Sequence, residues 1–145
     1  MHRRYDEKQG LDLVTILPGE FYSTNASQVI QTILGSCVSV VLMDETNGVC
    51  GMNHFMLAQA LGQNKYYETQ SGRYGMHAME LLVNEMLRIG ARRSKMTAKL
   101  FGGGSVLRFE GPRGSSIPDE NVRFARKYLE TERFPLVSSD TGGDY

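Results

Sequence analysis

Residues 33–57 read ILGSCVSVVLMDETNGVCGMNHFML and form the most strongly patterned stretch of the chain. Segment 38–43 is almost entirely apolar, a pattern typical of a strand that is buried on both faces. The following segment 44–48, DETNG, offers Asn-Gly at positions where a tight turn needs a positive φ. A returning strand over 49–57 completes the pattern, so the sequence predicts a β-hairpin.

The chain before this hairpin is expected to hold two further apolar segments. Residues 1–10 are polar and are expected to form a mobile N-terminal segment. Residues 11–17 are apolar and β-branched, which predicts a strand that a Pro-Gly pair ends. Residues 20–27 are rich in serine, threonine and asparagine and predict a loop. A second apolar run over 29–34 then leads into the hairpin.

The chain after the hairpin alternates helical and strand patterns. A long polar connection over 58–73 precedes a helix over 74–89, whose apolar residues recur at spacings of three and four: Met76, Met79, Val83, Met86 and Leu87. A strand over 96–101 comes next and is broken by three glycines. A second helix over 118–132 opens with Pro-Asp-Glu, and a last strand spans 135–138. This second helix is expected to turn three residues inward: Val122, Ala125 and Leu129. The order of elements predicts a mixed α/β or α+β class.

The composition fits one globular domain, expected over residues 11–145. The chain has 145 residues, with 16 basic and 16 acidic side chains and a formal net charge of zero. A nucleic-acid partner would favour a basic excess, so none is expected. No apolar run approaches the roughly 20 residues that cross a bilayer, so membrane insertion is not expected. The N-terminus lacks a signal-peptide pattern, which places the protein in the cytoplasm.

Cys37 and His54 are the candidate catalytic pair. Cys37 follows Gly35 and Ser36, a loop that can bend close to a substrate and present backbone N–H groups to a developing oxyanion. A thiol needs a neighbouring base to react at neutral pH, and His54 lies near the same end of the hairpin. One residue of register decides whether the two side chains share a face. The simpler alternative is a small core cysteine and a structural histidine.

Other conspicuous residues have simpler explanations. Cys50 is expected to pack in the core, with a resolving thiol as the alternative, and to lie too far from Cys37 for a disulfide. The glycine run 102–104 lacks the Lys-Ser/Thr of a phosphate-binding loop, so close packing near the site is expected. His77 is expected to be solvated or structural. Two cysteines and three histidines lack paired ligand spacing, so no metal site is expected. Three tyrosines are expected to pack or to line a groove: Tyr66, Tyr67 and Tyr74.

The sequence resembles the CheD family of chemoreceptor glutamine deamidases in four stretches. The first is the hairpin segment 33–57 quoted above. The others read GRYGMHAMELLVNEMLRIGARR (72–93), AKLFGGGSVL (98–107) and DTGG (140–143). They follow one another in the family's order from Thr32 to Gly143, and LGSCV followed by NHFML is the specific part. Family members run on beyond DTGG, so the C-terminus of this chain is expected to be short for the family.

The resemblance implies a catalytic set of Cys37, His54 and a threonine, without a metal or organic cofactor. Thr32 is the threonine in front of the Gly-Ser-Cys loop, and Gln31 takes its place if the register differs by one residue. The implied reaction converts receptor glutamines to glutamates through a thioester. The implied fold is a mixed β-sheet, sandwich-like core flanked by two main helices, as in other cysteine hydrolases that modify glutamine.

The resemblance also implies partners. Methyl-accepting chemotaxis receptors are the implied substrates. The main alternative is a binding module that docks on a CheC-type phosphatase and regulates chemotaxis signalling. A cysteine hydrolase acting on another amide or ester is a further alternative.

Overall fold

The hairpin forms as expected and lies at the centre of the larger sheet. In the computed structural model, which describes residues 1–57, 66–105 and 116–143, strand β5 (Val38–Asp44) pairs antiparallel with β6 (Val49–Asn53). The returning strand ends earlier than predicted, at Asn53. Phe55 nevertheless exchanges two backbone hydrogen bonds with Val38, so the pairing continues beyond the end of β6.

Three more strands extend the hairpin into a five-stranded mixed sheet with the order β3-β6-β5-β7-β8. β3 (Phe21–Thr24) pairs antiparallel with β6, and β7 (Thr97–Gly102) pairs antiparallel with β5. β8 (Leu136–Thr141) joins the edge parallel to β7. Parallel neighbours need a crossover connection, and helix α2 (Ile117–Thr131) lies between these two strands in the chain.

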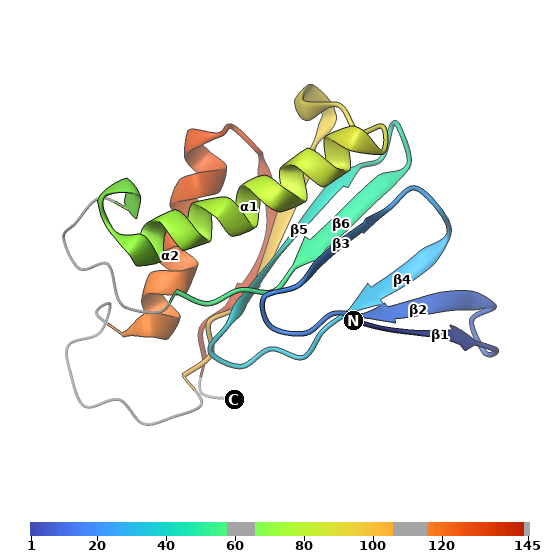
Figure 1. Ribbon diagram of the computed structural model, residues 1–145, viewed down its shortest axis with the longest axis horizontal. Helices are drawn as coiled ribbons and strands as arrows, with labels where there is room; N and C mark the ends of the chain where they lie inside the picture. Colours follow the sequence, from blue (N-terminus) through green and yellow to red (C-terminus); the bar gives the residue numbers. More distant parts are fainter. Residues whose placement is uncertain (58–65, 106–115, 144–145) are drawn as a thin grey trace.

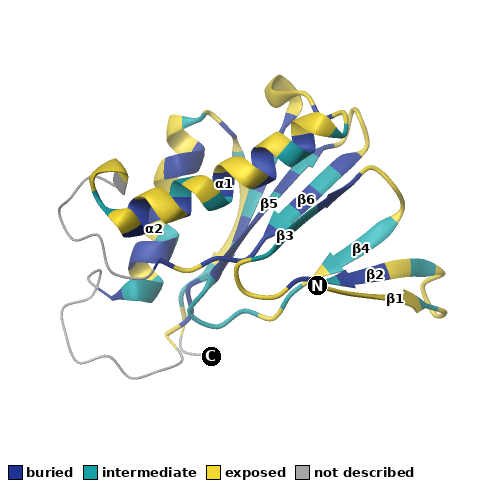
Figure 2. Ribbon diagram, viewed as in Figure 1, coloured by how far each residue is buried: buried dark blue, intermediate teal, exposed yellow. Residues whose placement is uncertain are grey.

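Both helices cover one face of this sheet (Figure 1). α1 (Gln70–Arg88) contacts β3 and β6, whereas α2 contacts β5, β7 and β8. The 3-10 turns η1 (Tyr66–Glu68) and η2 (Arg93–Lys95) lie before and after α1. The main hydrophobic core fills the space between helices and sheet, and the helices expose their opposite faces (Figure 2). Its fully buried members include Val38, Leu42, Phe55, Met79, Met86, Leu100, Phe124 and Leu129.

A second, three-stranded sheet lies away from the helices (Figure 1). Its central strand β2 (Leu11–Thr15) pairs antiparallel with β1 (His2–Asp6) and parallel with β4 (Gln28–Gln31). The predicted α+β class, with mixed sheets and two main helices, is therefore confirmed. The structure adds that the main core lies between the larger sheet and the helices.

Two expectations for the N-terminal region need correction. The loop expected over 20–27 contains β3, whose residues pair with β6, with Thr24 opposite Cys50. Phe21, Tyr22 and Thr24 are residue types that are common in strands, so the prediction of a loop missed a local strand signal. Residues 1–10 were expected to form a mobile segment, and β1 lies within them. Its backbone pairs with β2, and the terminal ammonium of Met1 binds Glu20 at 2.7 Å.

Helix α1 differs from the prediction in the residue at which it begins and in one of the residues that it buries. α1 begins at Gln70 because the Thr69 side chain accepts a hydrogen bond from the N–H of Gly72, which caps the first turn. Leu87 is exposed, so its predicted inward orientation is wrong; Leu82 is buried in its place. The other expected core positions of α1 are buried or half-buried: Met76, Met79, Val83 and Met86. Residues 58–65 of the predicted connection lie outside the described residues.

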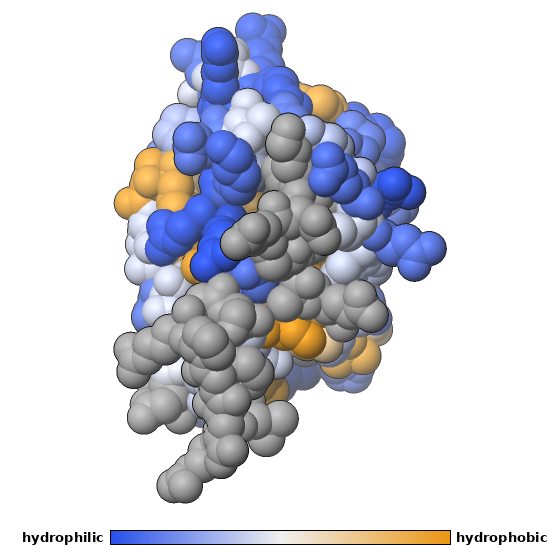
Figure 3. Space-filling model, turned by 90° about the vertical axis from the view of Figure 1, so that its left-hand side faces the viewer, coloured by the Kyte–Doolittle hydropathy of each residue, from blue (hydrophilic) through white to orange (hydrophobic). Residues whose placement is uncertain are grey.

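The end of the molecule shown in Figure 3 is mainly hydrophilic. On this end, hydrophobic residues form small separate areas. Neither α-helix in the described part of the chain combines the length and apolar character that crossing a membrane requires.

Candidate active site

The register of the hairpin places Cys37 and His54 on the same face of the sheet. Val38 lies directly opposite Phe55, so one step outward sets Cys37 opposite Met56. Side chains of directly opposed residues share a face, and successive residues of one strand alternate. His54 lies two residues from Met56 and therefore shares its face. This is the register that the catalytic pairing requires.

The Thr32 hydroxyl binds the Nδ1 atom of His54. The other ring nitrogen, Nε2, lies on the opposite side of the ring from this hydrogen bond. The His54 side chain is buried, with 3% exposed, and its Nδ1 lies 2.7 Å from Thr32 Oγ1. The same hydroxyl donates its proton to the Ile16 carbonyl at 2.8 Å. Because a carbonyl only accepts and the hydroxyl has one proton, Nδ1 must donate to Thr32. The neutral ring then carries a lone pair on Nε2, the form that a general base needs.

Burial keeps both candidate groups neutral. It lowers the pKa of His54 below the ordinary 6.5 and raises the pKa of the Cys37 thiol above its ordinary value. In the residues that the structure describes, Cys37 makes no hydrogen bond to His54. The resting pair is therefore a thiol and an imidazole, and proton transfer requires closer approach of the two side chains, as is common without substrate.

The loop before the thiol is held through its carbonyl groups. Gly104 N–H donates to the Gly35 carbonyl and Gly103 N–H donates to the Cys37 carbonyl, both at 2.8 Å. Gly102 has φ +105°, and an added Cβ would lie 2.2 Å from the Cys37 oxygen. The glycine run therefore permits a backbone approach that a side chain would block. Close packing of this run near the site is confirmed.

The N–H groups of this loop are left available. Among the described residues, no acceptor is hydrogen-bonded to the N–H of Ser36 or Cys37. Unpaired N–H groups beside a nucleophile are suited to binding an oxyanion. The C-terminal DTGG segment is hydrogen-bonded to the same glycine run, since Gly142 N–H donates to the Gly102 carbonyl at 3.0 Å.

Asn121 of α2 is a site residue that the sequence analysis missed. Its side chain is fully buried and donates to the Ser36 carbonyl at 2.9 Å. It also accepts from the Leu57 N–H at 2.8 Å. A signal was present in the sequence: Asn121 precedes Ala125 by one helical turn and so lies on the inward face, where a polar residue needs a partner.

Two of the remaining candidates, Tyr74 and His77, line a small pocket together with His54. Both cysteines are free, as expected, and Cys50 is half-buried opposite Met43 near the turn. His77 is exposed, as expected, and so are Tyr67 and Tyr74. Within the described ranges, no group of three or more His, Cys, Asp or Glu side chains is placed to hold a metal ion.

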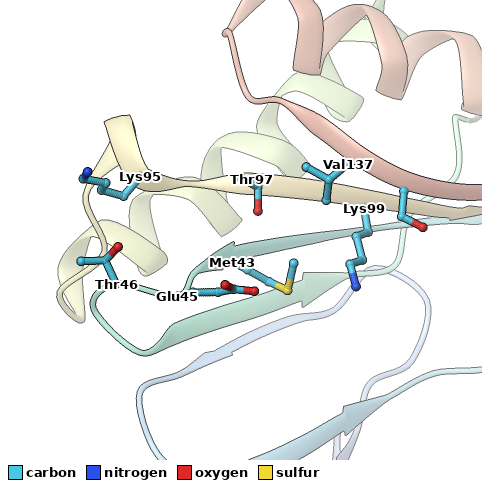
Figure 4. Close-up of a pocket in the computed structure, with 8 residues that line it drawn as sticks. Met43, Glu45, Thr46, Lys95, Thr97, Lys99 and Val137 are labelled. Atoms are coloured by element: carbon cyan, nitrogen blue, oxygen red, sulfur yellow. The ribbon is translucent and has the colours of Figure 1, made fainter.

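A hollow of about 530 Å³ lies elsewhere on the sheet (Figure 4). Residues of β5, β7 and β8 and of the neighbouring turns line it: Met43, Glu45, Thr46, Lys95, Thr97, Lys99, Val137 and Ser138. Met43 and Cys37 are six residues apart on an extended strand, about 20 Å. This hollow is therefore separate from the candidate site. The size of a hollow alone does not identify the catalytic residues.

Sequence comparison links the chain to proteins of one kind. Residues 56–145 match the family described as CheD chemotactic sensory transduction. The chain is 45% identical to a "Probable chemoreceptor glutamine deamidase CheD" of Laribacter hongkongensis, over 97% of this chain and 68% of that protein. A protein of the same name from Hahella chejuensis is 41% identical, over 100% of this chain and 67% of the relative. The chain thus spans about two thirds of these relatives, and the second alignment includes Thr32, Cys37 and His54.

A solved structure shares the fold. The crystal structure of a Neisseria meningitidis protein of the DUF152 family superposes with a TM-score of 0.56 over 96% of this chain and 65% of that chain. The sequences are 11% identical, so this likeness concerns architecture alone.

Proposed function

The chain belongs to the CheD family, and from that premise we propose that it deamidates glutamine side chains of chemoreceptors to glutamates. The observation that carries this proposal is the hydrogen bond between Thr32 and His54 Nδ1, which leaves Nε2 as a base on the face that Cys37 shares. Cys37 is the nucleophile, His54 the general base and Thr32 the residue that orients the imidazole.

In the first half of the reaction, His54 Nε2 takes the thiol proton and the Cys37 sulfur bonds to the glutamine amide carbon. The carbonyl oxygen becomes an oxyanion, for which the N–H groups of Ser36 and Cys37 are the available donors. When the carbonyl reforms, the C–N bond breaks and His54 returns the proton to the leaving nitrogen. Ammonia departs and a thioester remains on Cys37.

In the second half, water replaces ammonia. His54 takes a proton from the water, whose oxygen bonds to the thioester carbon. The C–S bond then breaks, and the thiol regains its proton from His54. The balance is glutamine plus water to glutamate plus ammonia, and no metal or organic cofactor enters it.

A protein substrate fits the surroundings of this site. Ile33 follows Thr32 directly and is 89% exposed. Met56 is also exposed, and its sulfur lies 3.8 Å from Ser36 Oγ. Leu17, which follows the Ile16 partner of Thr32, is a third exposed apolar residue. Large exposed apolar residues beside a nucleophile offer contacts to the receptor surface that carries the target glutamine.

The test is a receptor cytoplasmic fragment incubated with the protein and followed by mass spectrometry of its peptides. Wild type should replace the glutamine NH2 by OH at specific sites, whereas Cys37→Ser should lose nearly all activity and retain its melting temperature. A serine hydroxyl lacks the accessible ionisation of a thiol. Substantial activity in Cys37→Ser would exclude the thioester route.

Docking on a CheC-type phosphatase is the second function that we propose, with the cytoplasm as the compartment of both. The two functions are separable by mutation. Cys37→Ser should abolish deamidation and leave phosphatase binding unchanged, as measured by calorimetry with purified proteins. If Cys37→Ser lost phosphatase binding together with deamidation, docking would depend on the thiol itself.

A further inference from the structure

We propose that Asn121 is a positioning residue that orients the Cys37 N–H as an oxyanion donor. This inference rests on the proposed deamidase function. Asn121 reaches from α2 to the loop in front of the thiol, where its Nδ2 lies 2.9 Å from the Ser36 carbonyl. Its Oδ1 lies 2.8 Å from the Leu57 N–H. One side chain therefore connects the loop that carries Cys37 to the strand extension that carries His54.

The orientation of this amide follows from the chemistry of its partners. The Leu57 N–H can only donate, so it must face the amide oxygen. The Ser36 carbonyl can only accept, so it must face the amide nitrogen. Flipping the Asn121 side chain would break both hydrogen bonds at a fully buried position. The assignment of nitrogen and oxygen is thus fixed by the surrounding backbone.

The Ser36 carbonyl and the Cys37 N–H belong to one peptide group. A trans peptide is planar, and its C=O and N–H point in opposite directions. Holding the Ser36 oxygen toward Asn121 therefore directs the Cys37 N–H away from α2. The preceding peptide is held in the same way, since Gly104 N–H binds the Gly35 carbonyl and so orients the Ser36 N–H. Both proposed oxyanion donors owe their direction to a hydrogen bond on the far side of their own peptide.

This role differs from simple attachment of α2 to the sheet. An oxyanion forms during deamidation but not during alkylation of the thiol by iodoacetamide. A residue that orients the oxyanion donor should therefore affect kcat and leave alkylation unchanged. A residue that only stabilises α2 should act through folding stability, and Ser116 provides the matched comparison. Ser116 caps α2 with its side chain and, among the residues that the structure describes, makes no hydrogen bond to the Cys37 loop.

The experiment compares Asn121→Ala and Ser116→Ala with wild type. Asn121→Ala should lower kcat about 10- to 100-fold, below the 10²–10³-fold typical of losing an oxyanion donor outright. KM and the rate of Cys37 alkylation should stay within about twofold of wild type. Ser116→Ala should lower the melting temperature and keep kcat. If Asn121→Ala does not fold, Asn121→Asp takes its place, because it keeps the acceptor for Leu57 and loses the donor to Ser36.

Two kinetic outcomes overturn the inference. One is a kcat within twofold of wild type in the folded Asn121 variant. The other is an equal fall of kcat and alkylation, which would assign Asn121 to the thiol–imidazole pair instead. The NMR resonance of the Cys37 amide provides a readout without substrate: it should move in the Asn121 variant and stay in Ser116→Ala. A wild type inactive on receptors would refute the proposed function, and an unmoved Cys37 resonance would refute the positioning role.

Discussion

At the scale of single residues, the Thr32 hydroxyl joins segments that lie far apart in the sequence. It donates to Ile16 and accepts from His54, so it sets both the position and the tautomer of the imidazole. Gln31 was the alternative for this role, but its side-chain amide donates to Thr15 Oγ1 at 2.8 Å. The geometry thus favours Thr32 as the orienting residue.

Thr32→Ala should be a slow enzyme with a normal fold. Loss of one hydrogen bond to His54 removes about 1–2 kcal/mol of stabilisation, which corresponds to a roughly 5- to 30-fold lower kcat. Thr32→Ser keeps the hydroxyl and should be close to wild type. Steady-state kinetics and thermal melts measure both. If Thr32→Ala had wild-type kinetics and Gln31→Ala had a strongly reduced kcat, Gln31 would be the residue that orients the His54 imidazole.

The pH profile of kcat/KM should report His54. Only the neutral imidazole can take the thiol proton, and burial lowers the pKa of His54 below 6.5. The base form therefore persists at pH 6.5, and activity is lost only as the pH falls through the lowered pKa. Initial rates between pH 4.5 and 8 on a fixed receptor fragment test this. An acid limb with its midpoint above 6.5 would contradict the assignment of His54 as a buried base.

At the scale of elements, the hairpin is anchored at its turn by Asp44. This carboxylate is buried and accepts from the Arg92 N–H at 2.8 Å and from the Asn47 N–H at 3.0 Å. It therefore ties the turn of the hairpin to the segment after α1. The other end of the hairpin, where Cys37 lies, is tied to the end of β7 by the glycine run.

Asp44 should make the fold sensitive to acid. The hydrogen bond from Arg92 and those from Asn47 hold the pKa of Asp44 below its ordinary 3.8. A lowered folded-state pKa gives stability that is present above pH 3.8 and is lost as the pH falls toward the folded value. Asp44→Asn lacks this titration, so its melting temperature should fall less than that of wild type between pH 5 and pH 3. If the melting temperatures of the two proteins fell equally over this pH range, Asp44 would not be the source of the acid sensitivity.

At the scale of the whole molecule, the candidate site is built from residues that follow strands of both sheets and from a residue of helix α2. Thr32 follows β4 of the smaller sheet, His54 follows β6 of the larger sheet, and Asn121 comes from α2. Exposed apolar residues lie next to these segments, among them Leu17, Ile33 and Met56. A receptor that docks here would contact the ends of several elements at once.

Ile33→Asp should weaken recognition of the receptor and spare the chemistry. Removing the contact of one large apolar side chain costs about 1.5–3 kcal/mol if it becomes fully buried on docking, a roughly 10- to 100-fold lower kcat/KM. Activity on a short glutamine peptide should be unchanged. Val137→Asp is the matched control, because Val137 is 56% exposed on β8, away from the site. Equal kcat/KM on the receptor for Ile33→Asp and wild type would exclude this contact.

The sequence by itself determined the central hairpin, the two main helices and the chemical candidates. Continuous apolar residues and the DETNG turn specify the hairpin, since strand burial and turn geometry are local properties. The inward stripes of both helices follow from helical periodicity, apart from Leu87, which lies one residue beyond Met86 and thus about 100° around the helix. Cys37 and His54 were recognisable because few side chains can act as nucleophile and base.

Only the tertiary structure decided the relations between distant segments. β3 pairs with β6, with Phe21 opposite Asn53, although the two residues lie far apart in the sequence. The choice of Thr32 over Gln31 depends on a smaller sheet that sets Ile16 beside β4. Asn121 lies 85 residues from Ser36 in the chain, and hydrogen bonds over such separations depend on packing that local sequence patterns do not encode.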